Sequence, residues 1–168
     1  MQAPELEQVM LAYRSLVRTS RRLRRLVRPI YDAWELTGAQ FATLSRIPPG
    51  GISLTELAET ALADPATVSG VVERLVKSGL VQRERSETDR RVLVITLTDR
   101  GKEVVNAITP QHQQAVAQVF GNIPPERLEL LCELLAEVDR GIDEAKKALE
   151  AMAAPPPPDQ SHTTYKHK

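Results

Sequence analysis

The segment from residue 53 to residue 98 places the strongest constraint on the fold of this chain. Its hydrophobic pattern predicts two short helices and then two strands, residues 80–85 and 91–97, joined by a charged tip with Asp89 and Arg90. An arginine at such a tip cannot contribute to a hydrophobic core. A helix pair followed by a hairpin with a basic tip can reach two grooves of a DNA duplex. The segment therefore favours a protein that binds DNA.

Two capping boxes predict where the first helices of this region begin. Residues 37–40 (Thr-Gly-Ala-Gln) and 53–56 (Ser-Leu-Thr-Glu) each place a hydroxyl at the N-cap and a Gln or Glu three residues later. In such a box, each side chain bonds the backbone N–H of the other residue. The first box predicts a helix to about Arg46, where a Pro-Pro-Gly-Gly sequence ends it. The second predicts a short helix to about Thr60.

The next helix is the candidate for contact with DNA bases. Asp64 and Pro65 suit its N-cap and first position, and Gly79 follows its end at about Ser78. Its apolar residues recur at helical spacing and predict a buried stripe, namely Val68, Val71, Val72 and Leu75. The outer face is small and polar at its N-terminal end, which permits close approach to base edges and suits the N-terminal N–H groups to phosphate. That face comprises Ala66, Thr67, Ser69, Gly70, Glu73, Arg74 and Lys77. A face of this kind is also ordinary for an exposed helix, and the adjoining hairpin favours the DNA-binding interpretation.

Three longer helices are predicted outside this region from apolar residues at helical spacing. The first covers residues 5–34, and Pro29 should bend or break it near its end. The second covers residues 98–120 after a Thr98 cap, with an interruption near Pro110, where the proline should kink it. The third begins at about Pro125. Few aromatic residues, 4% of the chain, suit such a helical protein packed by Leu, Val and Ala.

The charges are unevenly distributed although the formal net charge is zero. Residues 14–28 hold seven arginines and no acid, whereas residues 122–150 hold eight acids and four bases. Arginines 14, 18, 21, 25 and 28 fall on one stripe of the first helix. This stripe is either a solvated face, a surface for DNA phosphates, or a partner for the acidic helix of a second subunit.

Several other classes of protein find no support in the sequence. No window approaches the roughly 18 apolar residues of a membrane span. The single cysteine, Cys132, excludes internal disulfides, fits a reducing cytoplasm, and is expected to be buried among leucines. There is no phosphate-binding glycine loop, nucleophile elbow or zinc motif, and the histidines at 112, 162 and 167 are scattered. We therefore expect a cytoplasmic protein that is not an enzyme and has no cofactor or metal.

Four motifs, in order along the chain, resemble the MarR family of winged helix-turn-helix regulators. They lie at residues 36–41, 53–58, 75–81 and 89–98, and the last resembles the wing signature of the family. The similarity covers about residues 10–150. It implies a mainly α fold with a small β-hairpin wing.

The resemblance also implies a domain organisation. One regulator domain, residues 5–153, would consist of a winged helix-turn-helix head at about 36–98 and dimerisation helices at about 5–34 and 99–152. Residues 154–168 include four consecutive prolines and no apolar pattern, which predicts a flexible tail.

The function implied by the resemblance is that of a homodimeric repressor on a palindromic operator in double-stranded DNA. Helix 65–78 would be the recognition helix, Arg91 would enter the minor groove, and Asp89 would orient a nearby arginine, although turn preference also accounts for Asp89. Many family members have a longer side chain at Gly70, so base readout here should rest more on Thr67, Ser69 and Arg74. The expected DNA-binding residues are Ala66, Thr67, Ser69, Gly70, Arg74, Lys77, Asp89, Arg90 and Arg91.

A small aromatic or anionic ligand is expected to release the operator, since family members commonly bind such molecules between the dimerisation helices and the head. Arg28, Tyr31 and Trp34 are the candidate ligand contacts, and core packing is an alternative explanation for Tyr31 and Trp34. Two other functions stay open: a winged-helix module for protein contacts without DNA binding, and a regulator that does not respond to a ligand.

Overall fold

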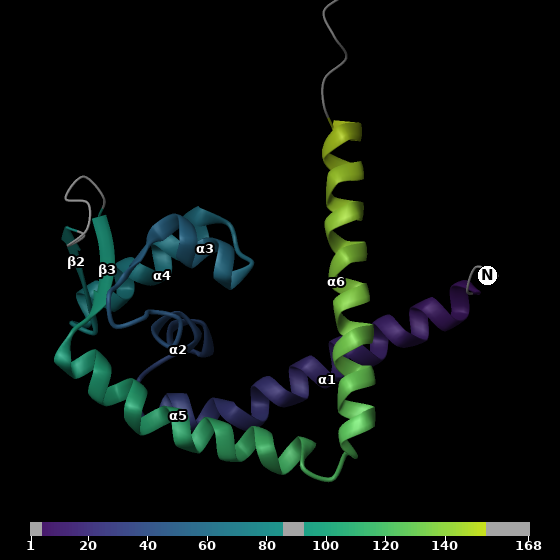
Figure 1. Ribbon diagram of the computed structural model, residues 1–168, viewed down its shortest axis with the longest axis horizontal. Helices are drawn as coiled ribbons and strands as arrows, with labels where there is room; N and C mark the ends of the chain where they lie inside the picture. The colour runs from purple at the N-terminus through teal and green to yellow at the C-terminus, as the bar shows by residue number, and fades with distance from the viewer. Residues whose placement is uncertain (1–4, 86–92, 154–168) are drawn as a thin grey trace, which may run out of the picture. The chain divides into compact units, whose positions relative to one another are not determined.

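The computed structural model describes residues 5–85 and 93–153, and it is mainly helical with one small sheet (Figure 1). The chain divides into two compact units, Met1–Val119 and Phe120–Lys168. The predicted fold class, α with a small β-hairpin, is confirmed. In order the elements are α1 (Leu6–Asp32), α2 (Gly38–Leu44), β1 (Ile52–Ser53), α3 (Leu54–Ala61), α4 (Pro65–Lys77), β2 (Val81–Arg85), β3 (Leu93–Leu97), α5 (Asp99–Phe120) and α6 (Pro125–Ala153).

The predicted caps hold the helices of the head. Thr37 and Gln40 form a complete capping box, as do Ser53 and Glu56. The carboxylate of Asp64 accepts a hydrogen bond from the backbone N–H of Thr67 at 2.8 Å, and Pro65 opens α4. These boundaries follow from bonds between residues three positions apart, which is why the sequence alone predicts them.

The sheet is antiparallel with the strand order β1-β3-β2. Strands β2 and β3 pair from Val81 opposite Leu97 to Arg85 opposite Leu93, as the hairpin prediction requires. The two-residue strand β1 was not predicted, because two residues are too few to show an alternating pattern. It follows Gly51, whose φ of +80° suits glycine and whose missing Cβ would come within 2.8 Å of Thr96 Cγ2.

The core of the first unit lies where α2, α3 and α4 meet the sheet and the first half of α5. Its most deeply buried side chains are Leu44, Leu57, Val72, Leu75, Val81 and Ile108. Gly101 brings the first turn of α5 against the hairpin, because a Cβ there would overlap the carbonyl oxygen of Leu80. The head is therefore continuous with α5 through packing as well as through the chain.

Neither proline interrupts its helix, and the bend at Pro29 and the kink at Pro110 stay predictions. Helix α1 continues through Pro29 to Asp32, and α5 continues through Pro110 to Phe120. A proline removes one backbone donor and crowds the preceding turn. The buried residues Val27 and Tyr31 flank Pro29, and the buried Ile108 precedes Pro110, so core packing holds the chain helical on both sides.

Helix α6 forms most of the second unit. Its apolar side chains recur at helical spacing, and many are exposed: Leu130, Leu134, Leu135, Val138, Ile142 and Leu149. Cys132 is also exposed, contrary to the prediction of a buried thiol, because neighbouring leucines on this helix are themselves exposed. Within residues 5–85 and 93–153, no helix combines the length and the apolar character that a membrane crossing requires.

Candidate nucleic-acid interface

Helix α4 is held on one side and open on the other. Val68, Val71, Val72 and Leu75 are buried and pack against α2, α3 and the start of β2. The predicted outer face is half-buried or exposed at every position: Ala66, Thr67, Ser69, Gly70, Glu73, Arg74 and Lys77. Because the core contacts hold the helix axis, the outer face presents a rigid surface with two cations and one acid.

Asp64 caps the N-terminus of α4. Its carboxylate accepts hydrogen bonds from the Thr67 N–H at 2.8 Å and from the Thr67 hydroxyl at 2.6 Å. These bonds lower the pKa of Asp64, with the side-chain bond contributing most. The Thr67 N–H is therefore not free for a phosphate. The Thr67 hydroxyl, which donates to Asp64, offers its lone pairs to a base donor.

The hairpin presents charged side chains on its strands. Arg83, Glu84 and Arg85 are exposed on β2. Glu84 accepts hydrogen bonds from Gln82 at 2.8 Å and from Thr96 at 3.0 Å, so it is tied to the sheet. The wing residues Asp89, Arg90 and Arg91 lie outside the described residues, and their contacts with DNA stay a prediction.

The arginines of α1 form an exposed basic surface. Tyr13 and Val17 line a hollow on this surface together with five of the arginines: Arg14, Arg18, Arg21, Arg22 and Arg25. Arg28 lies further along and pairs with Asp32 at 3.1 Å. Among the described residues the other six arginines form no ion pair with an acid. The three interpretations of this surface remain open.

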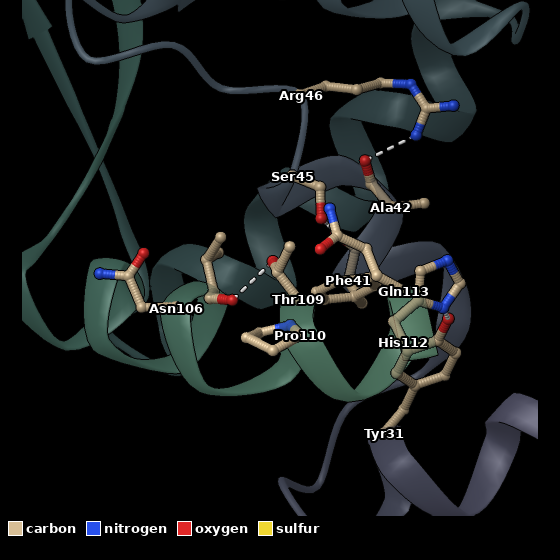
Figure 2. Close-up of a pocket in the computed structure, with 11 residues that line it drawn as sticks. Tyr31, Phe41, Ala42, Ser45, Arg46, Asn106, Thr109, Pro110, His112 and Gln113 are labelled. Atoms are coloured by element: carbon tan, nitrogen blue, oxygen red, sulfur yellow. Dashed lines mark hydrogen bonds between the residues drawn. The ribbon is translucent and has the colours of Figure 1, made fainter. Parts of the chain in front are cut away.

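A cleft of about 680 Å³ lies between α1, α2 and α5 (Figure 2). Among the residues that line it, the Tyr31 and Phe41 rings stack with centroids 5.0 Å apart, and the Tyr31 hydroxyl shares a 2.8 Å hydrogen bond with His112 Nδ1. Burial raises the pKa of Tyr31. Its other lining residues are Ala42, Ser45, Arg46, Val105, Asn106, Thr109, Pro110 and Gln113.

Arg46 brings a positive charge to this cleft. Its guanidinium donates to the carbonyl oxygens of Ala42 at 2.6 Å and Thr60 at 3.2 Å, which links α2 to the end of α3. Among the described residues it forms no ion pair. The cleft is therefore lined by two stacked aromatic rings, by amide and hydroxyl side chains, and by one cation, Arg46.

Of the three predicted ligand contacts, Tyr31 alone lines this cleft among the described residues. Arg28 is turned to its salt bridge with Asp32, and Trp34 lies beyond the end of α1 with 41% of its surface exposed. Core packing accounts for Tyr31, which is 6% exposed, but not for Trp34. The contacts from α5 were missed because they lie far from Tyr31 in the sequence, where periodicity carries no information on neighbours.

Comparisons with known proteins identify the family of this chain. The sequence model of the MarR family matches residues 36–93. The HTH-type transcriptional repressor NicR of Pseudomonas putida is 34% identical over 107 residues, which are 62% of this chain and 68% of NicR. The first matches to curated relatives span 61% to 92% of the length of those proteins.

Two solved structures are similar over most of the chain. Sco3205, a MarR family regulator from Streptomyces coelicolor in complex with DNA, has a TM-score of 0.72 and 28% identity, covering 84% of this chain and 91% of that one. BpsR of Bordetella bronchiseptica, whose DNA binding is regulated by 6-hydroxynicotinic acid, has a TM-score of 0.65 and 28% identity, covering 77% and 98%. The chain belongs to the MarR family of DNA-binding winged helix-turn-helix transcriptional regulators.

Proposed function

We propose that this regulator is a homodimeric repressor that binds a palindromic operator and releases it when a small aromatic acid enters the α1–α2–α5 cleft. The observation that carries the proposal is the outer face of α4, which is held rigidly by four buried residues and left open to solvent. In a winged helix-turn-helix protein this helix enters the major groove. Thr67, Ser69, Arg74 and Lys77 would then supply the polar contacts, with Ala66 and Gly70 allowing close approach.

The wing would add a second set of contacts. Strands β2 and β3 pair up to Arg85 and Leu93, and the residues that join them include Asp89, Arg90 and Arg91. In the proposal Arg91 enters the minor groove beside the site of α4. A narrow minor groove concentrates negative potential, so a guanidinium there is stabilised more than at an open surface.

Dimerisation is supported by apolar side chains that remain uncovered in the single chain. On α1, Leu6, Val9, Leu11 and Leu16 are exposed, and α6 has its own exposed apolar series. Exposed apolar surfaces of this extent favour association. A twofold dimer would present two copies of α4, which matches a palindrome with half-sites about 34 Å apart.

The cleft supports control by an aromatic acid. The stacked Tyr31 and Phe41 rings offer an aromatic surface, and Arg46 offers a cation for a carboxylate. Because α2 packs against α4 and lines the cleft, a bound ligand could change the angle of the recognition helix. The neighbour BpsR, regulated by 6-hydroxynicotinic acid, is consistent with this chemical class.

The test begins with the DNA. Selection by the full-length protein from duplexes with a random centre should enrich a palindrome, and sedimentation should give a dimer that binds one duplex. Binding of the enriched duplex is then titrated with 6-hydroxynicotinic acid and related aromatic acids. By linkage, an acid that weakens DNA binding must bind the complex more weakly by the same factor. Failure to enrich any sequence would refute specific DNA binding, and a folded monomer would refute the dimer.

A control separates the ligand from the DNA. Arg46→Gln keeps hydrogen-bond donors while removing the charge, so it should weaken the response to an aromatic acid and leave DNA affinity without ligand nearly unchanged. If every acid tested leaves both DNA affinity and thermal stability unchanged, the cleft is not an effector site for this class.

A further inference from the structure

Gly70 lies near the middle of the outer face of α4, where the fold does not require a glycine. A Cβ built at this position would meet only one neighbouring atom, Arg74 Nη1, at 3.9 Å, which is an ordinary van der Waals distance. The helix has no positive φ there, since the positive-φ glycines described are Gly51 and Gly79. Glycine lowers the stability of a helix interior relative to alanine. Neither packing nor backbone conformation therefore explains this residue.

The neighbouring arginine does make use of the missing side chain. Arg74 is four residues further along, so it lies on the same side of the helix one turn later. Helical side chains point back toward the N-terminus, and Arg74 Nη1 lies 3.9 Å from the position that a Gly70 Cβ would take. Within the described part of the chain, the Arg74 guanidinium forms no hydrogen bond or ion pair. A side chain at position 70 that extends beyond Cβ would therefore compete with the guanidinium for this space.

We propose that Gly70 is a positioning residue for DNA recognition: it leaves the space in which the Arg74 guanidinium lies low across the outer face of α4 and meets a guanine edge. This inference rests on the proposed function of α4. A guanidinium can donate two parallel hydrogen bonds to O6 and N7 of guanine, provided that its plane is correctly placed. A long side chain at position 70 would fill the space and displace the guanidinium outward.

A double-mutant cycle tests this coupling. The probe is the duplex best enriched by the wild-type protein, compared with its variants at each single base pair. Arg74→Ala should weaken binding by about 10- to 100-fold and remove discrimination at one G·C pair in each half-site. Gly70→Leu should cause a similar loss at the same base pair. In the double variant the loss should equal that of Arg74→Ala alone, because both substitutions act on one contact.

Gly141→Ala, on α6, is the control for the added methyl group. Nothing lies within 4 Å of its Cβ, so it should leave the affinity and the base preference unchanged and raise the melting temperature by a few degrees. Gly70→Ala adds a Cβ 3.9 Å from Arg74 Nη1, so it fills less of the space than a long side chain and should cause a smaller loss than Gly70→Leu. If Gly70→Leu is unstable, Gly70→Gln replaces it in the double-mutant cycle as the variant with a long side chain.

The outcomes separate the inference from the proposed function. If the wild-type protein enriches no duplex, the proposed function fails and the inference fails with it. If the wild type is specific but the two losses add in the double variant, Gly70 does not act through Arg74. If Gly70→Ala causes as large a loss as Gly70→Leu, the backbone of Gly70 contacts DNA directly, and the positioning role is wrong.

Discussion

The Tyr31 hydroxyl and His112 Nδ1 share a hydrogen bond of 2.8 Å although the two residues are 81 positions apart. The bond joins the end of α1 to the middle of α5, and both side chains line the cleft (Figure 2). The Phe41 ring from α2 packs against both, with centroid distances of 5.0 Å and 5.5 Å. Three helices thus meet at one aromatic cluster, and a ligand in the cleft would contact all three.

Tyr31→Phe should destabilise the protein by about 0.5–1.5 kcal/mol, because it deletes this hydrogen bond and leaves His112 without its partner. Urea denaturation followed by circular dichroism measures the change. His112→Phe in the same background should add little, since the bond is already absent. Full additivity of the two substitutions would contradict the coupling between α1 and α5.

Stability should decline in alkaline solution through the same tyrosine. Burial raises the pKa of Tyr31 above its usual value of 10.0, so the folded state retains the proton at a pH where the unfolded state loses it. The contribution of Tyr31 is therefore fully present below about pH 10 and diminishes as the pH rises through the folded-state pKa. Denaturation at several alkaline pH values should show a shallower decline for Tyr31→Phe. Parallel curves for the two proteins would contradict the assignment.

Gly101→Ala should cost about 1–3 kcal/mol or more, because the added Cβ overlaps the Leu80 carbonyl oxygen and either α5 or the hairpin must move. Thermal and urea unfolding measure the loss. Gly141→Ala, which meets nothing within 4 Å, is the control and should stabilise the protein slightly. An unchanged unfolding midpoint for Gly101→Ala would mean that α5 does not pack against the hairpin as described.

Leu62→Asn should stabilise the protein by about 0.5–1 kcal/mol. Leu62 is the C-cap of α3 and has a left-handed backbone with a φ of 49°. Because its side chain is 88% exposed, burial does not offset the strain of this conformation. Asparagine tolerates this conformation better than leucine does. Leu62→Val, with a β-branched side chain, should be destabilising instead. The opposite order of the two variants in urea would show that Leu62 is not strained.

Asp64→Ser should tighten DNA binding. Serine keeps the N-cap of α4, while the substitution removes a negative charge from the end of the proposed recognition helix. The affinity should increase a few-fold at low salt, and the difference should shrink as the salt concentration rises. Asp99→Asn, which removes an equal charge at the start of α5, should have a smaller effect. Equal effects would indicate general electrostatics in place of a contact at α4.

Much of the head was predictable because its signals are local. The caps at Thr37, Ser53 and Asp64 bond to residues three positions away, and the apolar stripe of α4 repeats within one helix. The hairpin register follows from strands adjacent in sequence. Once the apolar stripe of α4 is assigned to the core, the remaining residues must form its outer face. That face could therefore be predicted without knowing which elements pack against the helix.

The sequence by itself determined the helices, the hairpin and the family, since each depends on residue types at short spacing. The tertiary structure decided what the chain brings together over long distances. It kept α1 and α5 continuous through Pro29 and Pro110, paired Ile52 with Ile95, and placed His112 against Tyr31 while leaving Trp34 outside the cleft. Such contacts arise from the closing of long loops and the filling of one shared core, and periodicity within a single segment carries no record of either.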